Sequence, residues 1–323
     1  MKNTRWGIML AAAAVPLALA GPATAVAAPA PVGQAEQQAF TPIEERYWND
    51  ADLQQLLGQP VDSEQVDGQV TYQAFQYGWL FHAEGVGVTE IHGDIAARYN
   101  DSGGYATLGA ATADETGAPD GVGRYNHFTG GDATGAASIY WTPDTGAQGV
   151  WGPVREFWES KGWELGYLGY PTKTTSATAD EAGRYNHFVG PDGAGASVYW
   201  SEETGAHSVQ GEIRNVWAAQ GWETGVLGYP TTDEQVAADE VGRSNEFTGT
   251  STPPGAAYWH PDSGAHWLTG AILTHWDELG RESSYLGYPT SEPYEVDGGQ
   301  RVDFQGGYAV LTAENGAVED FPW

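Results

Sequence analysis

The chain has 323 residues, with 13 Lys and Arg against 43 Asp and Glu, which gives a net charge of −30 at pH 7. Nucleic acid is a poor partner for so acidic a chain, because phosphates attract clustered Lys and Arg. The chain contains no Cys, which excludes disulfides, thiol nucleophiles and thiolate metal sites.

The N-terminus has the pattern of a secretory signal. Lys2 and Arg5 precede an apolar run that ends near Ala20, and Ala25-Val26-Ala27 fits a cleavage site, with Ala23-Thr24-Ala25 as an alternative. We therefore expect a signal peptide over residues 1–27 and a flexible lead-in rich in Ala and Pro over 28–35. The mature chain is expected to be secreted, with no membrane span.

The rest of the chain repeats with a period of 59 residues. Leu168-Gly169-Tyr170-Pro171-Thr172 returns as 227–231 and again as 286–290, and weaker copies start at Leu57 and Leu108. A fixed period of this size predicts a tandem repeat whose outer copies are the most altered. The expected units are an atypical first repeat over 36–92, then 93–151, 152–210 and 211–269, and a C-terminal cap over 270–323.

Each unit is expected to begin with a short helix. In the third unit Gly152-Pro153 opens the helix, Val154, Phe157 and Trp158 share one apolar face, and Gly162 ends it. This spacing predicts that Trp158, Trp217 and Trp276 lie in the core. A helix of about ten residues is too short to persist unpacked, so it must lie on another element.

Strands follow the helix in each unit. Residues 183–190, Gly-Arg-Tyr-Asn-His-Phe-Val-Gly, alternate with a period of two between glycines and predict a strand, and residues 197–200 predict a second one. Arg184, Asn186 and Phe188 share one face of the first strand. Tyr185 and His187 share the other face, which varies between copies and is expected to face solvent.

These motifs together resemble the LGFP repeat of actinobacterial envelope proteins, with Tyr in place of the usual Phe of the tetrad. The resemblance covers essentially all of residues 36–323. It implies a mainly β repeat protein of α+β units, in which small four-stranded β units, each with one short helix, stack as an elongated stalk. A closed five-bladed propeller is the alternative architecture. The resemblance also implies binding to the cell wall polymer, peptidoglycan with its attached glycan, here without an attached mycoloyltransferase or hydrolase.

The Arg and Asn of the first strand are candidate ligand-binding residues, because Arg suits bidentate capture of a carboxylate. The alternative is a structural ion pair between each Arg and the acid of a Gly-Trp-Glu motif, Glu164 or Glu223. The end units have Gln69 and Gln300 at the Arg position, so they are expected to bind less well. The candidates in the inner units are Arg124, Asn126, Arg184, Asn186, Arg243 and Asn245.

Aromatic residues on rigid turns form a second group of candidates, because Trp and Tyr rings can stack on sugars. Trp163 and Trp222 follow helix caps, and Tyr170, Tyr229 and Tyr288 lie in the Pro turns. A structural role in the core is the alternative, since each small repeat has little else to bury.

Catalytic patterns are absent from the sequence. It contains no Gly-x-Ser-x-Gly elbow, His-Glu-x-x-His motif, phosphate loop or EF-hand. We therefore expect a monomeric, non-catalytic, wall-binding module with no catalytic residue, metal or cofactor. A purely structural envelope spacer and a cell-wall hydrolase or esterase are the alternatives.

Overall fold

The computed structural model describes residues 39–131, 134–249 and 254–323, and residues 40–323 form one compact unit. The expected signal peptide and lead-in lie outside the described residues. Within the described part, no helix is long and apolar enough to cross a membrane.

Short helices precede each sheet. The first two units have two α-helices each, rather than the single helix expected, and the last three have one α-helix followed by a 3-10 turn. The helices are α1 (Pro42–Asn49), α2 (Ala51–Leu57), α3 (Gly93–Asp101), α4 (Gly104–Leu108), α5 (Gly152–Ser160), α6 (Gly211–Ala219) and α7 (Gly270–Leu279), and the 3-10 turns are η1 (Trp163–Leu165), η2 (Trp222–Thr224) and η3 (Arg281–Ser283).

Five open antiparallel sheets follow one another along the chain, and in each the main strands pair in sequence order. The first sheet contains β1 (Gln65–Asp67), β2 (Val70–Phe75), β3 (Gly78–Ala83) and β4 (Gly87–His92), and the second contains β5 (Thr116–Gly117), β6 (Arg124–Gly131), β7 (Gly135–Thr142) and β8 (Gly146–Trp151). The third contains β9 (Tyr170–Pro171), β10 (Ser176–Ala177), β11 (Gly183–Val189), β12 (Gly195–Ser201) and β13 (Gly205–Gln210). The fourth contains β14 (Gln235–Val236), β15 (Arg243–Phe247), β16 (Gly255–His260) and β17 (Gly264–Thr269), and the fifth contains β18 (Tyr294–Val296), β19 (Gly299–Phe304), β20 (Gly307–Thr312) and β21 (Val318–Pro322). The expected tandem of small four-stranded β units is confirmed.

The Leu-Gly-Tyr-Pro tetrad joins the helix to the sheet. Gly169 has φ +65°, and a Cβ there would lie 2.0 Å from the carbonyl oxygen of Val189, so only glycine fits this close approach. Pro171 pairs with Phe188 at the sheet edge. The indole Nε1 of Trp158 donates to the carbonyl oxygen of Gly169 at 3.1 Å, which ties α5 to the tetrad.

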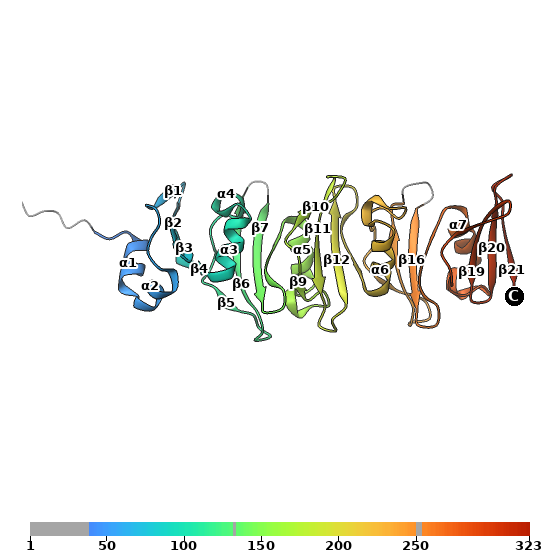
Figure 1. Cartoon of the computed structure of the whole chain (residues 1–323), viewed down its shortest axis with the longest axis horizontal. Coiled ribbons are helices and arrows are strands. Elements are labelled where there is room, and N and C mark those ends of the chain that lie inside the picture. Colours follow the sequence, from blue (N-terminus) through green and yellow to red (C-terminus); the bar gives the residue numbers. More distant parts are fainter. Residues whose placement is uncertain (1–38, 132–133, 250–253) are drawn as a thin grey trace, which may run out of the picture. The chain divides into compact units, whose positions relative to one another are not determined.

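Among the described residues, four hydrophobic cores lie between consecutive sheets, and a fifth lies within the first unit, where Ile43, Tyr47 and Phe75 pack together. One core takes Tyr140 from the second sheet, Trp158 from α5, and Phe188 and Val198 from the third sheet. Figure 1 shows α5 between β7 and β12, and α6 between β12 and β16. Trp158 and its equivalents in α6 and α7 are fully buried, as the helix spacing predicts.

This arrangement corrects one expectation about the strand faces. The face of β11 that carries Tyr185 and His187 does not point to solvent. Tyr185 packs against the core formed with the fourth unit, and the ring of His187 lies 5.1 Å from that of Trp222. Both faces of an inner sheet are covered, because each inner sheet has a helix of its own unit on one side and a helix of the next unit on the other.

The Asn that recurs at the same position of each inner unit joins two sheets. The side-chain amide of Asn186 donates to Gly149 O on β8 at 3.2 Å and to Lys173 O at 2.7 Å. Its oxygen accepts from the hydroxyl of Thr175 at 2.5 Å. Asn126 and Asn245 make the same pair of donations to the preceding sheet and to their own connector.

The tetrad Tyr also joins neighbouring units. Its hydroxyl donates to an Asp in the connector of the preceding unit: Tyr170 to Asp120 at 2.8 Å, Tyr229 to Asp180 at 2.7 Å and Tyr288 to Asp239 at 2.9 Å. Each ring passes over a glycine; at Gly242, a Cβ would lie 2.1 Å from the Tyr288 hydroxyl. The hydroxyl that distinguishes Tyr from the usual Phe therefore has a structural partner at all three junctions.

The Asn contacts predict a large stability loss on substitution. Asn186→Ala removes three hydrogen bonds, to the carbonyl oxygens of Gly149 and Lys173 and from the hydroxyl of Thr175, which should cost about 3 kcal/mol of unfolding free energy. Asn186→Asp should destabilise at least as strongly at pH 7, although it keeps the shape, because a carboxylate cannot donate to two carbonyls. Thermal and urea unfolding of the full chain measure this, with Arg184→Gln as the exposed neighbouring control. An Asn186→Asp variant as stable as wild type would contradict the assignment.

The contacts between the tetrad Tyr and the connector Asp residues predict that the stability of the fold depends on pH. Burial alone would raise the pKa of Asp120 and Asp180, but backbone amides and the Tyr hydroxyls outweigh it and lower both. For Asp239, the amide of Gly242 above all lowers the pKa. A lowered folded-state pKa gives stability that is complete above the unfolded value of about 4 and is lost as pH falls through the folded value.

Replacing Tyr170, Tyr229 and Tyr288 by Phe together should therefore keep the fold but lower the melting temperature at pH 7. Each lost hydrogen bond should cost about 1 kcal/mol. The difference in melting temperature between wild type and the triple variant should shrink as the pH falls from 6 to 3. A difference that is constant over this range would show that the carboxylates are not the partners that matter.

Candidate functional site

Trp163 and Trp222, both candidates for sugar stacking, lie in the junctions between units. Each has a positive φ of 57° and is half-buried. The ring of Trp163 lies 5.1 Å from that of His127 and 5.1 Å from that of Trp158, and the Arg155 guanidinium lies over it at 4.8 Å. Trp222 makes the matching contacts with His187, Trp217 and Arg214.

At the next junction, between the fourth and fifth units, both members of this His–Trp pair are replaced. Glu246 stands at the His187 position and Arg281 at the Trp222 position, and they form an ion pair at 3.3 Å. A His–Trp contact has become a Glu–Arg contact at the same place, so both positions serve the packing of units. The structure thus places Trp163 and Trp222 in a packing role.

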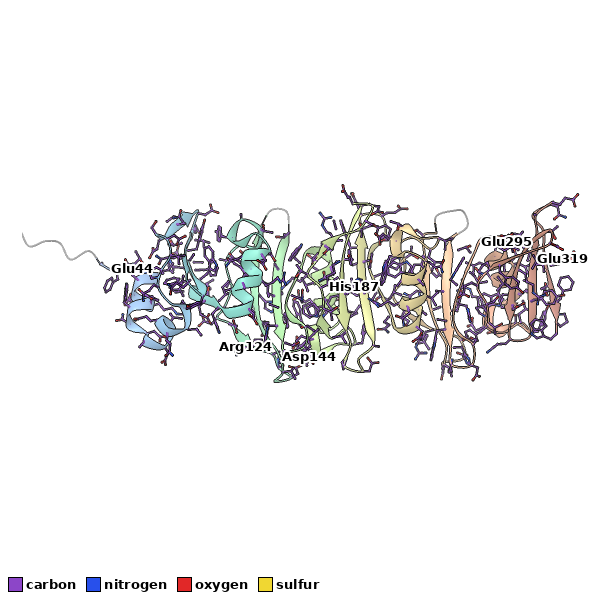
Figure 2. All side chains as sticks on the ribbon, in the orientation of Figure 1. Glu44, Arg124, Asp144, His187, Glu295 and Glu319 are labelled. Atoms are coloured by element: carbon purple, nitrogen blue, oxygen red, sulfur yellow. The ribbon has the colours of Figure 1, made fainter. Side chains whose placement is uncertain are left out.

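The His residues beside these Trp rings are neutral at pH 7. Burial, together with the nearby Arg155, lowers the pKa of His127 to about 4. Burial, Arg214 and Lys173 do the same for His187. Figure 2 shows His187 inside the ribbon and Arg124 at its rim. The buried His residues therefore supply no charge for a ligand.

The ion pair expected between Arg and the acid of Gly-Trp-Glu does not form. Glu223 instead accepts from the backbone amide of Ala179 in the preceding unit at 2.7 Å. Arg124 pairs with Glu115, and Arg243 lies 3.7 Å from Glu234. Arg184 is exposed, and its guanidinium donates to Gly183 O at 3.0 Å. Glu223 thus holds the connector of the preceding unit.

Each of these arginines lies directly across the strand pair from a Trp. The partners are Arg124 and Trp141, Arg184 and Trp200, and Arg243 and Trp259. Residues opposite one another share a face and can touch. The three Trp residues are half-buried and pack at the edge of the junction core. These Trp residues are not among the ligand-binding candidates expected from the sequence, although their strict 59-residue spacing was a signal for them.

The two end units lack this Arg–Trp pair. In the fifth unit Gln300 stands at the Arg position, as expected from the sequence, and it lies opposite Leu311. In the first unit the register places Thr71, rather than Gln69, opposite His82. Gln69 precedes β2 because the first unit has two additional residues between its glycine and Phe75. The pair is therefore a property of the inner units only.

The Asn and Tyr candidates are not available to a ligand in the same way. Asn126, Asn186 and Asn245 are buried, and their amide groups are used between sheets. Burial above all raises the pKa of the hydroxyls of Tyr170, Tyr229 and Tyr288, so they remain donors to their Asp partners. Of the candidate residues, the arginines are the ones at an accessible rim.

A pocket of about 570 Å³ lies at the junction of the third and fourth units, beside Arg243 and Trp259. The end of β13 and the start of α6 form one wall with Gln210, Glu212 and Ile213, and Glu234 lies beside Arg243. The loop before β12 and Tyr167 complete the lining. We name this space the junction pocket.

The equivalent space between the first and second units is smaller, about 200 Å³, and is lined by His92, Asp94, Glu115, Arg124 and Trp141. These residues occupy the positions of Gln210, Glu212, Glu234, Arg243 and Trp259. The same arrangement of residues therefore occurs at two junctions. The His92 imidazole fills part of the space at the first, and the space at the other is an open pocket. Among the described residues, no group of three or more His, Asp or Glu is placed to hold a metal ion.

Comparison with solved structures gives low similarity. A triple arginine mutant of AofleA from Arthrobotrys oligospora is 16% identical, with 68% of this chain and 58% of that chain covered and a TM-score of 0.16. The β-propeller domain of the Trilobed protease from Pyrococcus furiosus is 7% identical, with 83% of each chain covered and a TM-score of 0.15. The periplasmic gluconolactonase PpgL from Pseudomonas aeruginosa is 11% identical, with 82% and 66% covered and a TM-score of 0.13. TM-scores this low carry no argument.

No curated protein matches the sequence. The family model of the LGFP repeat matches four consecutive stretches, each starting at or just before a Leu-Gly pair: residues 57–106, 108–166, 168–225 and 227–284. These matches cover more than half of the chain, and the fifth sheet follows the last of them. The chain therefore belongs to the LGFP repeat family.

Proposed function

We propose that this protein is a secreted, non-catalytic module that binds the cell wall polymer, peptidoglycan or its attached glycan, through weak sites repeated at the junctions between units. LGFP repeats are modules of cell-envelope proteins, which supports an envelope location. The observation that carries the proposal is the Arg–Trp pair at the rim of three successive junctions.

The chemistry of this pair suits an acidic sugar polymer. A guanidinium binds a carboxylate through two parallel hydrogen bonds, and an indole offers a flat apolar face beside it. The connector before Arg184 has Thr175 at the position where the connectors before Arg124 and Arg243 have Glu115 and Glu234. The described residues give Arg184 no acidic partner, so its charge is available to an anion.

The net charge of −30 opposes binding to a polyanion. Screening limits this repulsion, because the Debye length is about 8 Å at physiological ionic strength. The three arginines therefore act at short range, and each site alone is weak. Several sites on one chain facing a repetitive polymer then act by avidity.

A structural spacer is the second candidate function. The observation that favours it is the large number of polar side chains used between units, including the Asn clamps and the Tyr–Asp contacts. Those contacts explain how the units are held together. They leave the Arg–Trp pairs unexplained, because replacement of the pair by Gln300 and Leu311 is compatible with the same fold.

The wall-binding proposal predicts that Arg184→Gln with Arg243→Gln lowers retention on insoluble cell wall. Gln is the residue of the fifth unit, so the double variant should fold and melt like wild type. A pull-down at increasing salt measures the effect, and deleting repeats should lower binding more than proportionally. A charge-matched control, Arg46→Gln with Arg98→Gln, should bind like wild type once melting shows that it folds. Undiminished binding by a folded Arg184/Arg243 double variant would assign these arginines no binding role.

The proposal also predicts no hydrolase or acyltransferase activity. The reason is that the described residues bring together no nucleophile and base beyond the packing contacts above. Purified protein incubated with peptidoglycan and with acyl esters should release no soluble fragments or free acid. Turnover that a single substitution abolishes would overturn this prediction.

A further inference from the structure

We propose that the junction pocket binds the zwitterionic side-chain end of a diamino-dicarboxylic residue of a wall peptide, in which an ammonium and a carboxylate group lie on one carbon. Arg243 takes the carboxylate, and Glu234 with Glu212 takes the ammonium. This inference rests on the proposed function and specifies the ligand class at one of its sites.

The charges lining the pocket carry the argument for an ammonium group. Three carboxylates, those of Asp192, Glu212 and Glu234, line the pocket with one guanidinium, that of Arg243. Asp192 and Glu212 are exposed. Glu234 is largely buried, with its side chain 15% exposed, and it accepts from the amide of Gln210 at 3.1 Å. A buried carboxylate is stable only when it is paired. One guanidinium at 3.7 Å leaves this pocket short of positive charge.

The first junction shows what the same constellation does with a cation. His92 stands at the position of Gln210, and its Nδ1 lies 2.8 Å from Glu90 and 3.3 Å from Glu115. The hydrogen bond to Glu90 above all raises the pKa of His92, which favours the imidazolium. Glu115, the equivalent of Glu234, therefore has two basic side chains beside it, His92 and Arg124.

The third and fourth units keep this acid as Glu234 but replace both His92 and its nearer partner Glu90, by Gln210 and Ser208. With Gln210 in place of His92, the space beside Glu234 is open and larger, about 570 Å³ against about 200 Å³. A ligand ammonium placed there makes the contact that His92 makes at the first junction. The same ammonium lies near Trp259, whose ring face attracts cations.

The apolar part of the pocket fits the rest of a peptide end. Ala196, Ile213 and Pro191 line the pocket beside the charged groups, which suits a short aliphatic side chain. A neutral sugar would offer neither Glu212 nor Arg243 a charged contact from the ligand. The balance of one cation against several acids thus favours a ligand that carries both charges over a simple anion.

Three small probes with the same aliphatic chain test this directly: norleucine carries both groups, hexanoate is norleucine without the ammonium, and pentylamine is norleucine without the carboxylate. Titration calorimetry of the full chain should show norleucine, in the D or L form, binding more tightly than either. Chitobiose serves as the neutral sugar. Glu212→Gln and Arg243→Gln should each weaken norleucine about tenfold, as expected for loss of a charged hydrogen bond.

Gln210→Lys gives the sharpest variant, because it supplies an ammonium from the chain itself, as His92 supplies an imidazolium. It should abolish norleucine binding without lowering the melting temperature. Glu156→Gln, an exposed acid on α5, is the charge-matched control and should leave binding unchanged.

The outcomes separate the two proposals. If wild type binds cell wall but prefers hexanoate or chitobiose to norleucine, the zwitterion assignment is overturned and the wall-binding function stands. If norleucine binds and the variants behave as described, but wild type does not bind wall, the pocket is supported and the wall-binding function fails. Unchanged norleucine binding in a folded Gln210→Lys variant would also overturn the assignment.

Discussion

A tryptophan buried between two sheets is the contact on which the rest of the structure depends. Trp158, Trp217 and Trp276 each fill the space between one unit's helix and the sheets on either side, and each indole Nε1 donates to the tetrad glycine carbonyl of its own unit at 3.0–3.1 Å. Each unit after the first shares its core with a neighbour, because residues of the preceding sheet, such as Tyr140 and Val150, pack with the residues of the unit itself. Stability is therefore shared between nearest neighbours, as in other repeat proteins.

This shared core explains why so many side chains that resemble ligand-binding residues are occupied. Asn186 donates to a carbonyl of the preceding sheet, the hydroxyl of Tyr229 to an Asp of the preceding connector, and Trp222 packs on His187. Each is polar or aromatic because a junction between two sheets contains backbone groups that must be paired. The rim beyond the core has no such constraint, and there the arginines and their cross-strand Trp partners lie.

The three inner junctions share one frame but differ in charge. At the first, His92 and Arg124 lie beside Glu115. At the second, Thr175 replaces the acid, and the described residues give Arg184 no acidic partner. At the third, Glu234 lies beside Arg243. Such variation at fixed geometry is a way for a repeat protein to place different binding preferences along one chain. The frame is preserved because the variable side chains lie outside the Trp-centred core.

The sequence by itself determined the repeat, its period, the helix and strand segments, the buried Trp of each helix and the structural role of the tetrad. These follow from local rules: glycine at positive φ, proline at a bend, and periods of 3.6 and two. Only the tertiary structure decided what covers the second face of each sheet, and so corrected the expected solvent exposure of Tyr185 and His187. It also decided that the acid of Gly-Trp-Glu holds a backbone amide rather than an arginine, and that Trp259 faces Arg243. Those contacts join residues from different units or strands, and a period of 59 residues does not specify how one unit is placed against the next.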